Sequence, residues 1–589
     1  MVKMKKSKNT KGNTLLNFFG IVIIIILLNI VGSFFNKRID LTEDNRYSLS
    51  ENTKDLLKDN KQLKDRVFFK IYLDGDLPAD MKNVQKGIQN MLEEFVEVAG
   101  DRIQYTFINP DGEDDESFNK ELKTNIFDKG KGILPTNLKQ FDGQTSEIRT
   151  IWPGAIVEYG GETVDVIQFF DREAIIMDED VRQLVDNTIS QLEYKFISSI
   201  RRVTRVGRKS VGFLQGHGEL TKRQTWDVRQ TLEKDYIVDD VEIKGQLNAF
   251  IDIDALVIAK PTEPFNEKDK FIIDQFIMRG GKVMWFIDPI DVNRDSLAFT
   301  GETMCLSRNL NIEKDLIYKY GARINNDIIF DEECTHELIP PKDIKLPGLA
   351  WGFYPLLKPL EHPITMNIDP IKTEYISSVT PVNISDTAVK KTVLLQSSET
   401  SIRLLAPQRI NFGFAYEAYA PNISNSKYAN NPIAVLLEGQ FSSPFENRIS
   451  DAFLNGDKFD IKYKSIPNKM LVVADGDMIN SSFTYYAKGQ KKMAPISLSA
   501  DRFRVSTANG TAKFHFGNRD FFLNAIDYLL GDNSLISIRS KTVSLRMLNS
   551  DKVAKERSYW KFVNVIFPLL FIFIFGVLQY LIRKKKYTK

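Results

Sequence analysis

Two long apolar runs, one near each end of the 589-residue chain, constrain its fold most strongly. The first covers residues 15–35 and the second covers residues 562–582. A helix needs about 20 apolar residues to cross the hydrocarbon core of a bilayer, and both runs have that length. Pro568 lies inside the second run, which spanning helices tolerate where neighbours satisfy the freed carbonyl. The sequence therefore predicts a transmembrane helix at each end.

The charged flanks of these runs predict their orientation. Residues 1–14 hold five lysines and no acid, and residues 583–589 hold one arginine, four lysines and no acid. Short basic flanks remain in the cytoplasm. We expect two cytoplasmic tails and a periplasmic middle region, in a two-pass protein of the inner (cytoplasmic) membrane. A cleaved signal peptide is the alternative for the first run, but the run is longer than a usual signal and no small-residue cleavage site follows it.

The charge balance separates the ends of the chain from its middle. The chain has 79 basic and 77 acidic residues, and ten of the basic residues lie in the two tails. The remainder therefore carries more acids than bases. Because the excess basic charge lies beside the lipid bilayer, we expect no nucleic-acid partner. Cys305 and Cys334 can form one disulfide or remain two free thiols.

Residues 40–205 have the pattern of a first extracytoplasmic α/β domain. Ser48 and Glu51 fit a capping box, which predicts the start of a short helix. Apolar residues at three- and four-residue spacing predict a helix over 81–98. The other expected elements are strands over 67–73 and 103–108, a hairpin of 150–159 and 163–170 across Gly160 and Gly161, and a helix over 179–203.

Residues 206–540 predict a second extracytoplasmic α/β domain with a mostly parallel sheet, because strands and helices alternate. The expected strands are 210–214, 236–243, 255–259 and 283–287, and the expected helices are 223–232, 266–279 and 310–320. Residues 335–431 are rich in Pro, Asn and Ser and are expected to form an irregular loop region with short strands, such as one over 393–395. Strands over 433–437 and 470–474 should complete the sheet, followed by a helix over 518–530.

Gly216-His217-Gly218-Glu219 is the first candidate site, because it directly follows a predicted strand. Open α/β sheets bind ligands at the carboxyl ends of their strands. His217 can act as a base or a ligand, oriented by Glu219. The alternative is a tight turn that needs glycine, in which the histidine and the glutamate cap the next helix. A lone histidine without a second ligand or a nucleophile does not decide between the two.

Two further acidic turns and one interfacial pair complete the candidates. Asp288 follows a buried strand and is either a ligand contact or turn chemistry. Asp475-Gly476-Asp477 resembles half of a calcium loop, but the remaining ligand spacing is missing, so we interpret it as a turn. Arg46 and Tyr47 are expected at the membrane interface, in contact with lipid or a partner. The sequence predicts no catalytic residue, no cofactor and no metal site, since no Cys/His set has zinc spacing.

The sequence lacks the glycine-rich loop that holds nucleotide phosphates. The pattern G-x-x-x-x-G-K-[ST] does not occur, and Gly207-Arg208-Lys209-Ser210 lacks both the upstream glycine and the Gly-Lys order. The chain is therefore not expected to hydrolyse ATP. Energy for any transport must come from another subunit.

Five motifs occur in a fixed order between the two apolar runs. They are Asp40-Leu41-Thr42 with Arg46-Tyr47-Ser48-Leu49-Ser50, then Gly216-His217-Gly218-Glu219, and the segments 274–283, 432–439 and 517–524. In this arrangement the chain resembles the GldG family, the gliding-motility-associated auxiliary proteins of ABC transporters in Bacteroidetes. The resemblance implies a permease subunit in the membrane, a separate cytoplasmic ATPase subunit, and a role in gliding motility and the associated protein secretion system. It also implies a domain similar to that of intraflagellar-transport proteins.

The predicted function is that of a non-catalytic, membrane-anchored auxiliary subunit of an ABC-type transporter. Such a subunit would relay conformational change or dock partners in the periplasm. One alternative is a tethered substrate-binding module of the same transporter, with a closed cleft lined by residues 216–219 and Asp288. A second alternative is an envelope hydrolase, which needs a nucleophile beside a base, and the sequence shows no such motif.

Overall fold

The computed structural model describes residues 18–20, 22–24, 26–27, 48–59, 63–112, 116–127, 132–141, 146–170, 181–205, 207–337, 349–383, 389–415, 429–446, 448, 459–485, 493–499, 505–507, 510–512, 515–539 and 550–587. The chain divides into two compact units, residues 1–542 and residues 543–589. The first unit contains two principal sheets with their helices, and the second contains one long helix. The structure is therefore of the mixed α/β class.

A four-stranded sheet forms the N-terminal part of the first unit, in the order β2-β1-β5-β6. β1 (Val67–Ile71) pairs in parallel with β2 (Ile103–Phe107). β5 (Gly154–Tyr159) and β6 (Glu162–Gln168) form the predicted hairpin, and β5 pairs antiparallel with β1. Gly160 and Gly161 make its turn with φ of 62° and 92°, a left-handed region that glycine adopts without steric cost.

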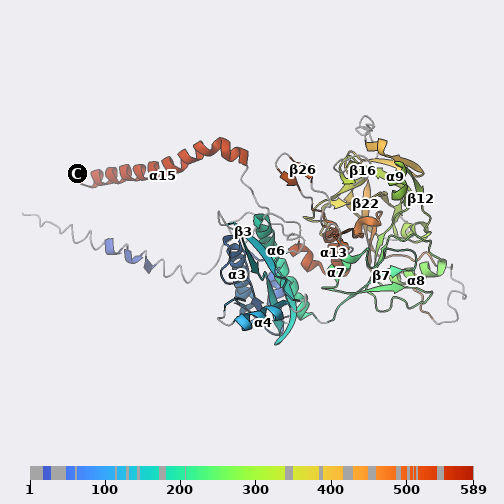
Figure 1. The fold of residues 1–589 in the computed structure, drawn as a ribbon, viewed down its shortest axis with the longest axis horizontal. Coiled ribbons are helices and arrows are strands. Elements are labelled where there is room, and N and C mark those ends of the chain that lie inside the picture. The colour runs from blue at the N-terminus through green and yellow to red at the C-terminus, as the bar shows by residue number, and fades with distance from the viewer. Residues whose placement is uncertain are drawn as a thin grey trace, which may run out of the picture. The chain divides into compact units, whose positions relative to one another are not determined.

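Two long helices, α3 (Ala79–Ala99) and α6 (Val181–Thr204), share one apolar core with this sheet (Figure 1). The apolar stripe of α3, from Met81 to Phe95, is fully buried, as its helical spacing predicts. The Phe69 ring of β1 meets the Phe196 ring of α6 edge-on, with centroids 5.2 Å apart. A fully buried phenylalanine contributes roughly 1.5–3 kcal/mol to the free energy of folding, so these rings hold the helices on the sheet.

Shorter elements complete this region. They are α2 (Glu51–Lys58), η1 (Gly100–Arg102), α4 (Glu116–Phe127), and a hairpin of β3 (Thr136–Phe141) and β4 (Ser146–Ile151). Two predicted details are wrong. The N-cap of α2 is Ser50 rather than Ser48, and the Ser50 hydroxyl oxygen accepts a hydrogen bond from the Thr53 N–H at 3.3 Å. The strand expected over 150–159 is interrupted before Gly154, because Pro153 has no N–H for a sheet ladder.

The second sheet has ten strands, in the order β15-β16-β19-β22-β23-β10-β9-β7-β8 with β17 paired to β16. The parallel half consists of β7 (Ser210–Gln215), β8 (Ile237–Glu242), β9 (Ala255–Ala259), β10 (Lys282–Phe286) and β23 (Asn468–Val473). The antiparallel half consists of β22 (Pro432–Gly439), β19 (Lys390–Gln396), β16 (Leu349–Pro359), β15 (Cys334–Glu337) and β17 (Ile371–Lys372). The sheet is therefore mixed rather than mostly parallel. A buried apolar run does not distinguish parallel from antiparallel pairing, which explains the difference.

The strands β7, β9, β10 and β23 of the parallel half are buried on both faces, where successive side chains of a strand point, whereas the edge strand β8 is largely exposed. Val257 and Phe286 belong to an apolar cluster with α7 (Trp226–Leu232) and α13 (Asn518–Leu529). Ile258 and Trp285 belong to the opposite cluster, with α8 (Glu267–Met278) and the π-helical turn η3 (Glu313–Ile317). Because apolar clusters with helices cover both faces of these inner strands, the ends of the strands are where a ligand or partner could reach them.

The short strand predicted over 393–395 is confirmed within β19, but the irregular loops predicted for residues 335–431 are wrong where the described part of this segment forms further strands. β16 is an eleven-residue strand of the second sheet, and β19 lies beside it. Smaller sheets pair β11 (Ile290–Val292) with β12 (Glu302–Ser307) and β21 (Gln408–Asn411), β13 (Ala322–Ile324) with β18 (Val379–Pro381), and β14 (Asp327–Phe330) with β20 (Ile402–Leu405). The helix expected over 310–320 is confined to η3 and α10 (Tyr318–Tyr320). The strands of these smaller sheets have only three to six residues each, which is too short for a clear alternating pattern.

The last part of the first unit is α14 (Asn533–Arg539), which follows α13 directly. The second unit is α15 (Ser550–Tyr587), one continuous helix that includes Pro568 (Figure 1). Within α15, Tyr559–Lys585 is long and apolar enough to cross a membrane, and it is the one such helix among the described residues. Most of the first apolar run, including residues 15–17 and 28–35, lies outside the described residues, so the second expected span stays a prediction.

Candidate functional site

The carboxyl ends of the parallel strands bring the predicted site residues to one edge of the second sheet. The turn from Gly216 to Glu219 follows β7, and Asp288 comes shortly after β10. Lys260 follows β9, and Asp475 comes shortly after β23. Parallel strands in adjacent register end at the same edge, which is the usual position of a ligand site in an open α/β sheet.

His217 is held between two carboxylates. Its Nδ1 lies 3.3 Å from Glu219 Oε1, and its Nε2 lies 3.1 Å from Asp269 Oδ2. The backbone N–H of His217 donates to Glu219 Oε2 at 2.7 Å, and its ring stacks on the Phe265 ring with centroids 3.9 Å apart. Asp269 belongs to α8, whose N-cap Asn266 donates a side-chain hydrogen bond to the same Asp269 oxygen at 2.7 Å. The histidine therefore joins the turn after β7 to the first turn of α8.

Both ring nitrogens of His217 already have partners, and the side chains of His217, Glu219 and Asp269 are almost wholly buried. Burial alone lowers the pKa of His217, but hydrogen bonds and charge from Glu219 and Asp269 outweigh it, so the net pKa is raised. Gly218 has φ of +73°, and a Cβ there would lie 2.0 Å from Thr262 Oγ1. Only the glycine backbone of this turn, at Gly216 and Gly218, is exposed.

A second polar cluster at the same edge joins Asp288 to four residues that sequence reasoning did not connect with it. The Lys260 Nζ lies 3.2 Å from Asp288 Oδ2 and also pairs with Asp477. Asp288 Oδ1 accepts a hydrogen bond from the Gly476 N–H, and Asp475 Oδ1 accepts one from the Asp477 N–H at 2.8 Å. The Asp475-Gly476-Asp477 segment is thus a turn fixed onto the ends of β9 and β10.

Burial dominates the electrostatics of this second cluster. It raises the pKa of Asp288, and it raises the pKa of Asp475 further with the help of the neighbouring carboxylates. Asp475 is fully buried, and its Oδ2 has no hydrogen-bond partner within the described structure. Three acids face one lysine, so we expect one carboxyl to hold a proton. Within the described ranges no group of three or more His, Cys, Asp or Glu is placed to hold a metal ion.

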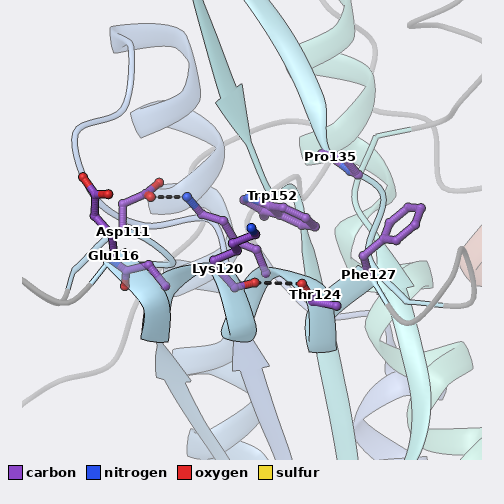
Figure 2. Close-up of a pocket in the computed structure, with 9 residues that line it drawn as sticks. Asp111, Glu116, Lys120, Thr124, Phe127, Pro135 and Trp152 are labelled. Atoms are coloured by element: carbon purple, nitrogen blue, oxygen red, sulfur yellow. Dashed lines mark hydrogen bonds and ion pairs between the residues drawn. The ribbon is translucent and has the colours of Figure 1, made fainter.

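One cavity of about 630 Å³ lies in the N-terminal part, beside α4 (Figure 2). Lys120, Lys123 and Phe127 of α4 line it on one side, and Trp152 lines it on another. Lys123 forms an ion pair with Asp111, which also borders the cavity. The mixture of charged and aromatic side chains resembles an ordinary surface hollow, and sequence reasoning had singled out none of these residues.

Arg539 connects the two principal sheets through their helices. Its guanidinium group lies 2.9 Å from Asp527 Oδ2 and 3.0 Å from the Tyr194 hydroxyl. Asp527 belongs to α13 of the second sheet, and Tyr194 belongs to α6 of the first sheet. The Tyr236 hydroxyl donates to the other Asp527 oxygen at 2.7 Å. The Arg539 and Asp527 side chains are only 13% and 6% exposed, so this ion pair is desolvated.

Three arginines at the end of α6 extend this contact. Arg202 lies 2.8 Å from Asp165 of β6 and 3.9 Å from Asp235, which precedes β8. Arg205 lies 3.6 Å from Asp235, and Arg201 pairs with Asp532. We call this set the arginine seam: Arg201, Arg202, Arg205 and Arg539 with Asp165, Asp235, Asp527 and Asp532. Basic side chains in the last turn of a helix also interact favourably with its dipole, which suits α6 to this position.

The remaining candidates are an interfacial pair and two cysteines. Arg46 and Tyr47 lie outside the described residues. Cys305 is buried in a β12 strand and Cys334 is half-buried, and both thiols are free. The arginine seam had no motif that could have revealed it, although the Arg201-Arg202 pair at a predicted helix end was a weak signal.

The fold and these clusters define a membrane-associated α/β protein in which the polar groups mostly satisfy one another. The family model described as "ABC-type uncharacterized transport system" matches residues 208–525, which is more than half of the chain. The chain therefore belongs to this family of auxiliary components of ABC transport systems. A second model, a domain of unknown function, matches residues 43–158.

Two solved structures show weak likeness. The mmIFT52 N-terminal domain is 11% identical, with a TM-score of 0.28, over 46% of this chain and 88% of that chain. The exo-beta-1,4-mannosidase Op5Man5 from Opitutaceae bacterium strain TAV5 is 9% identical, with a TM-score of 0.19, over 73% of this chain and 51% of that chain. Neither score is high enough to support an argument, so the intraflagellar-transport-type domain stays a prediction. A comparison with curated proteins gave no match.

Proposed function

We propose that this chain is a non-catalytic auxiliary subunit that carries conformational change between the membrane-spanning part of an ABC-type transporter and the periplasm. The observation that carries this proposal is the position of α14. Leu535 and Ile538 of α14 belong to the core of the first sheet, while α13, which it follows, belongs to the core of the second. The segment that leads toward α15 is therefore fixed to both sheets.

The arginine seam gives this connection its stiffness. Removing one partner from a buried ion pair leaves the other charge unsolvated, so such a pair resists separation. A displacement of α14 would move α6 through Tyr194 and α13 through Asp527 together. A rigid connection of this kind suits a subunit that transmits conformational change, because a displacement of α14 then also displaces α6 and α13.

The burial of the sheet-edge residues favours the relay over a tethered substrate-binding module. A binding cleft would present His217, Glu219 and Asp288 to a ligand, but each of these residues is at most 7% exposed. Both nitrogens of His217 are engaged by carboxylates. If the edge contacts a partner, we propose that it does so through the exposed backbone of Gly216 and Gly218.

Membership of the transport family supports the wider setting of the proposal. We propose that the chain crosses the inner membrane twice with both tails in the cytoplasm, and that a permease and a separate cytoplasmic ATPase complete the complex. The GldG-like motifs between the apolar runs support a role in gliding motility and the associated secretion system. Deleting the gene in its native host should then stop gliding.

Purification of the full chain from native membranes in mild detergent tests the proposal. We expect a membrane-spanning subunit and an ATPase to co-purify, and ATP hydrolysis to require the ATPase subunit. A tagged membrane protein of similar size from the same membranes is the control. Recovery of neither subunit would contradict the transporter assignment, and hydrolysis by the chain alone would contradict the non-catalytic role.

A further inference from the structure

The apolar part of α15 contains two amide side chains, Asn564 and Gln579, and both are exposed. The midpoint of Tyr559–Lys585 is Ile572. At a rise of 1.5 Å per residue, the two amides lie about 12 Å and about 10 Å from that midpoint, inside a hydrocarbon half-thickness of about 15 Å. A helix that crossed a bilayer in this register would therefore place both amides in the hydrocarbon core.

These amides lie on one side of the helix. At about 100° per residue, Gln579 is rotated about 60° from Asn564, and Pro568 is rotated about 40°. Phe571 and Phe575 lie on the same side, at about −20° and about 20° from Asn564, whereas Phe573 is on the opposite side at about 180°. We call Asn564, Pro568, Phe571, Phe575 and Gln579 the amide stripe.

Pro568 adds a third polar group to the amide stripe. A proline has no N–H, and in an α-helix that N–H would bond to the carbonyl four residues earlier. The residue four positions before Pro568 is Asn564. Asn564 therefore has a backbone carbonyl without its helical donor as well as a side-chain amide, at the same level of the helix.

Lipid tails cannot satisfy these groups, because they neither donate nor accept hydrogen bonds. Polar side chains and proline-freed carbonyls in spanning helices are normally satisfied by a neighbouring helix, and amide side chains hydrogen-bond across helix interfaces. The opposite side of α15, with Ile566, Phe573 and Val577, carries no amide side chain and suits lipid.

We propose that the amide stripe docks against a transmembrane helix of the membrane-spanning subunit of the transport system, with hydrogen-bonding side chains at the levels of Asn564 and Gln579. Transport needs a path through the bilayer, and a single helix cannot enclose one. A family of auxiliary transport components therefore requires a separate spanning subunit. This inference rests on the proposed function and adds to it the surface by which the chain is held.

Site-specific photocrosslinking tests the inference in the full chain in its native membrane. Phe571→benzoylphenylalanine and Phe575→benzoylphenylalanine place the crosslinker in the amide stripe, and Phe573→benzoylphenylalanine places it on the opposite side. Phe571 and Phe573 are matched, since their side chains are 69% and 71% exposed along the same helix. We expect the first two variants, but not the third, to crosslink to a spanning subunit.

A pair of multiple variants provides an independent readout. Asn564→Leu with Gln579→Leu removes both amides, and Ile566→Leu with Val577→Leu changes the opposite side by the same number of residues. Interhelical polar contacts in membranes are individually modest, so we expect the first variant to reduce the co-purified spanning subunit about tenfold and the second to leave it unchanged.

The outcomes separate this inference from the proposed function. Crosslinking of the stripe to a second copy of this chain, or to its own residues 15–35, would overturn the inference. So would equal crosslinking from both sides, or none from any position, when the spanning subunit still co-purifies. If no spanning subunit co-purifies with the unmodified chain, the proposed function fails as well.

Discussion

Replacement of Arg539 by methionine tests whether α14 is fixed to both sheets as the structure indicates. Methionine keeps most of the length of the side chain and removes the guanidinium group, which lies 2.9 Å from Asp527 and 3.0 Å from the Tyr194 hydroxyl. Asp527 would keep the hydrogen bond from Tyr236 but lose its ion pair with Arg539.

The expected cost follows from burial. Removing one partner of a buried ion pair costs about 3–5 kcal/mol, and the surviving bond from Tyr236 places this case near the lower end, at about 3 kcal/mol. Asp527→Asn combined with Arg539→Met removes both charges, so we expect the double variant to lose less stability than the sum of the two single variants. The coupling energy in this double-mutant cycle should be about 1.5–3 kcal/mol.

Hydrogen exchange of the backbone amides of α14 in the detergent-solubilised full chain measures the effect locally. A loss of about 3 kcal/mol should speed exchange over residues 533–539 roughly hundredfold. The control is Arg409→Met, since the Arg409–Glu302 pair is 63% and 48% exposed and should contribute under about 1 kcal/mol. Unchanged exchange in α14, or strictly additive effects of Arg539→Met and Asp527→Asn, would refute the reasoning.

Two pH-dependent predictions follow from buried groups of the second sheet. Burial raises the pKa of Asp274 from 3.8 to about 6, so the folded state holds this proton more tightly and stability falls as pH rises from about 4 to about 6. Asp274→Asn should remove up to about 3 kcal/mol of this pH-dependent loss of stability. Denaturant unfolding followed through the fluorescence of the buried Trp285 measures the free energy of unfolding at each pH. An unchanged pH profile in the variant would contradict this prediction. The pKa of His217 is raised by its contacts with Glu219 and Asp269, so these contacts stabilise the folded state fully at pH values below the unfolded pKa near 6.5. This stabilisation is lost as the pH rises through the folded-state pKa of His217. His217→Gln should therefore cost more stability at pH 6 than well above the folded pKa, and an equal cost at both pH values would show that the ring is neutral.

The sequence was sufficient to predict the α/β class and the C-terminal helix, because those features depend on local patterns. The 21-residue α3 follows its apolar stripe, and α15 covers the predicted run over 562–582. The strand ends that carry Gly216 and Asp288 were also visible, since a buried run followed by glycine or proline marks the end of a strand.

The partners of those residues could not be predicted, because they are far away in the sequence. His217 contacts Asp269 across 52 positions, and Asp288 contacts Gly476 across 188 positions. Arg539 contacts Tyr194 across 345 positions. Each contact depends on the strand order of the second sheet or on the return of α14 to the first, and neither leaves a periodic signal in the chain.

The long strand β16, in the antiparallel half of the second sheet, was missed for a related reason. β16 contains Gly352 among its aromatic residues and Pro355 directly after them, and both types normally argue against a strand. A Cβ on Gly352 would lie 2.4 Å from the Phe330 ring, so glycine there permits a close approach that packs this aromatic cluster. Tertiary packing, rather than local preference, decides the structure at this position.

Nucleotide-dependent hydrogen exchange in the purified transporter complex tests the relay most directly. With the chain, its spanning subunit and the ATPase together, a non-hydrolysable ATP analogue should change the exchange rates of α14 and of the end of α6. The Arg539→Met variant should uncouple the change in α6 from the change in α14. If exchange at both elements is the same with and without nucleotide, while the complex still binds the analogue, the chain does not relay conformational change.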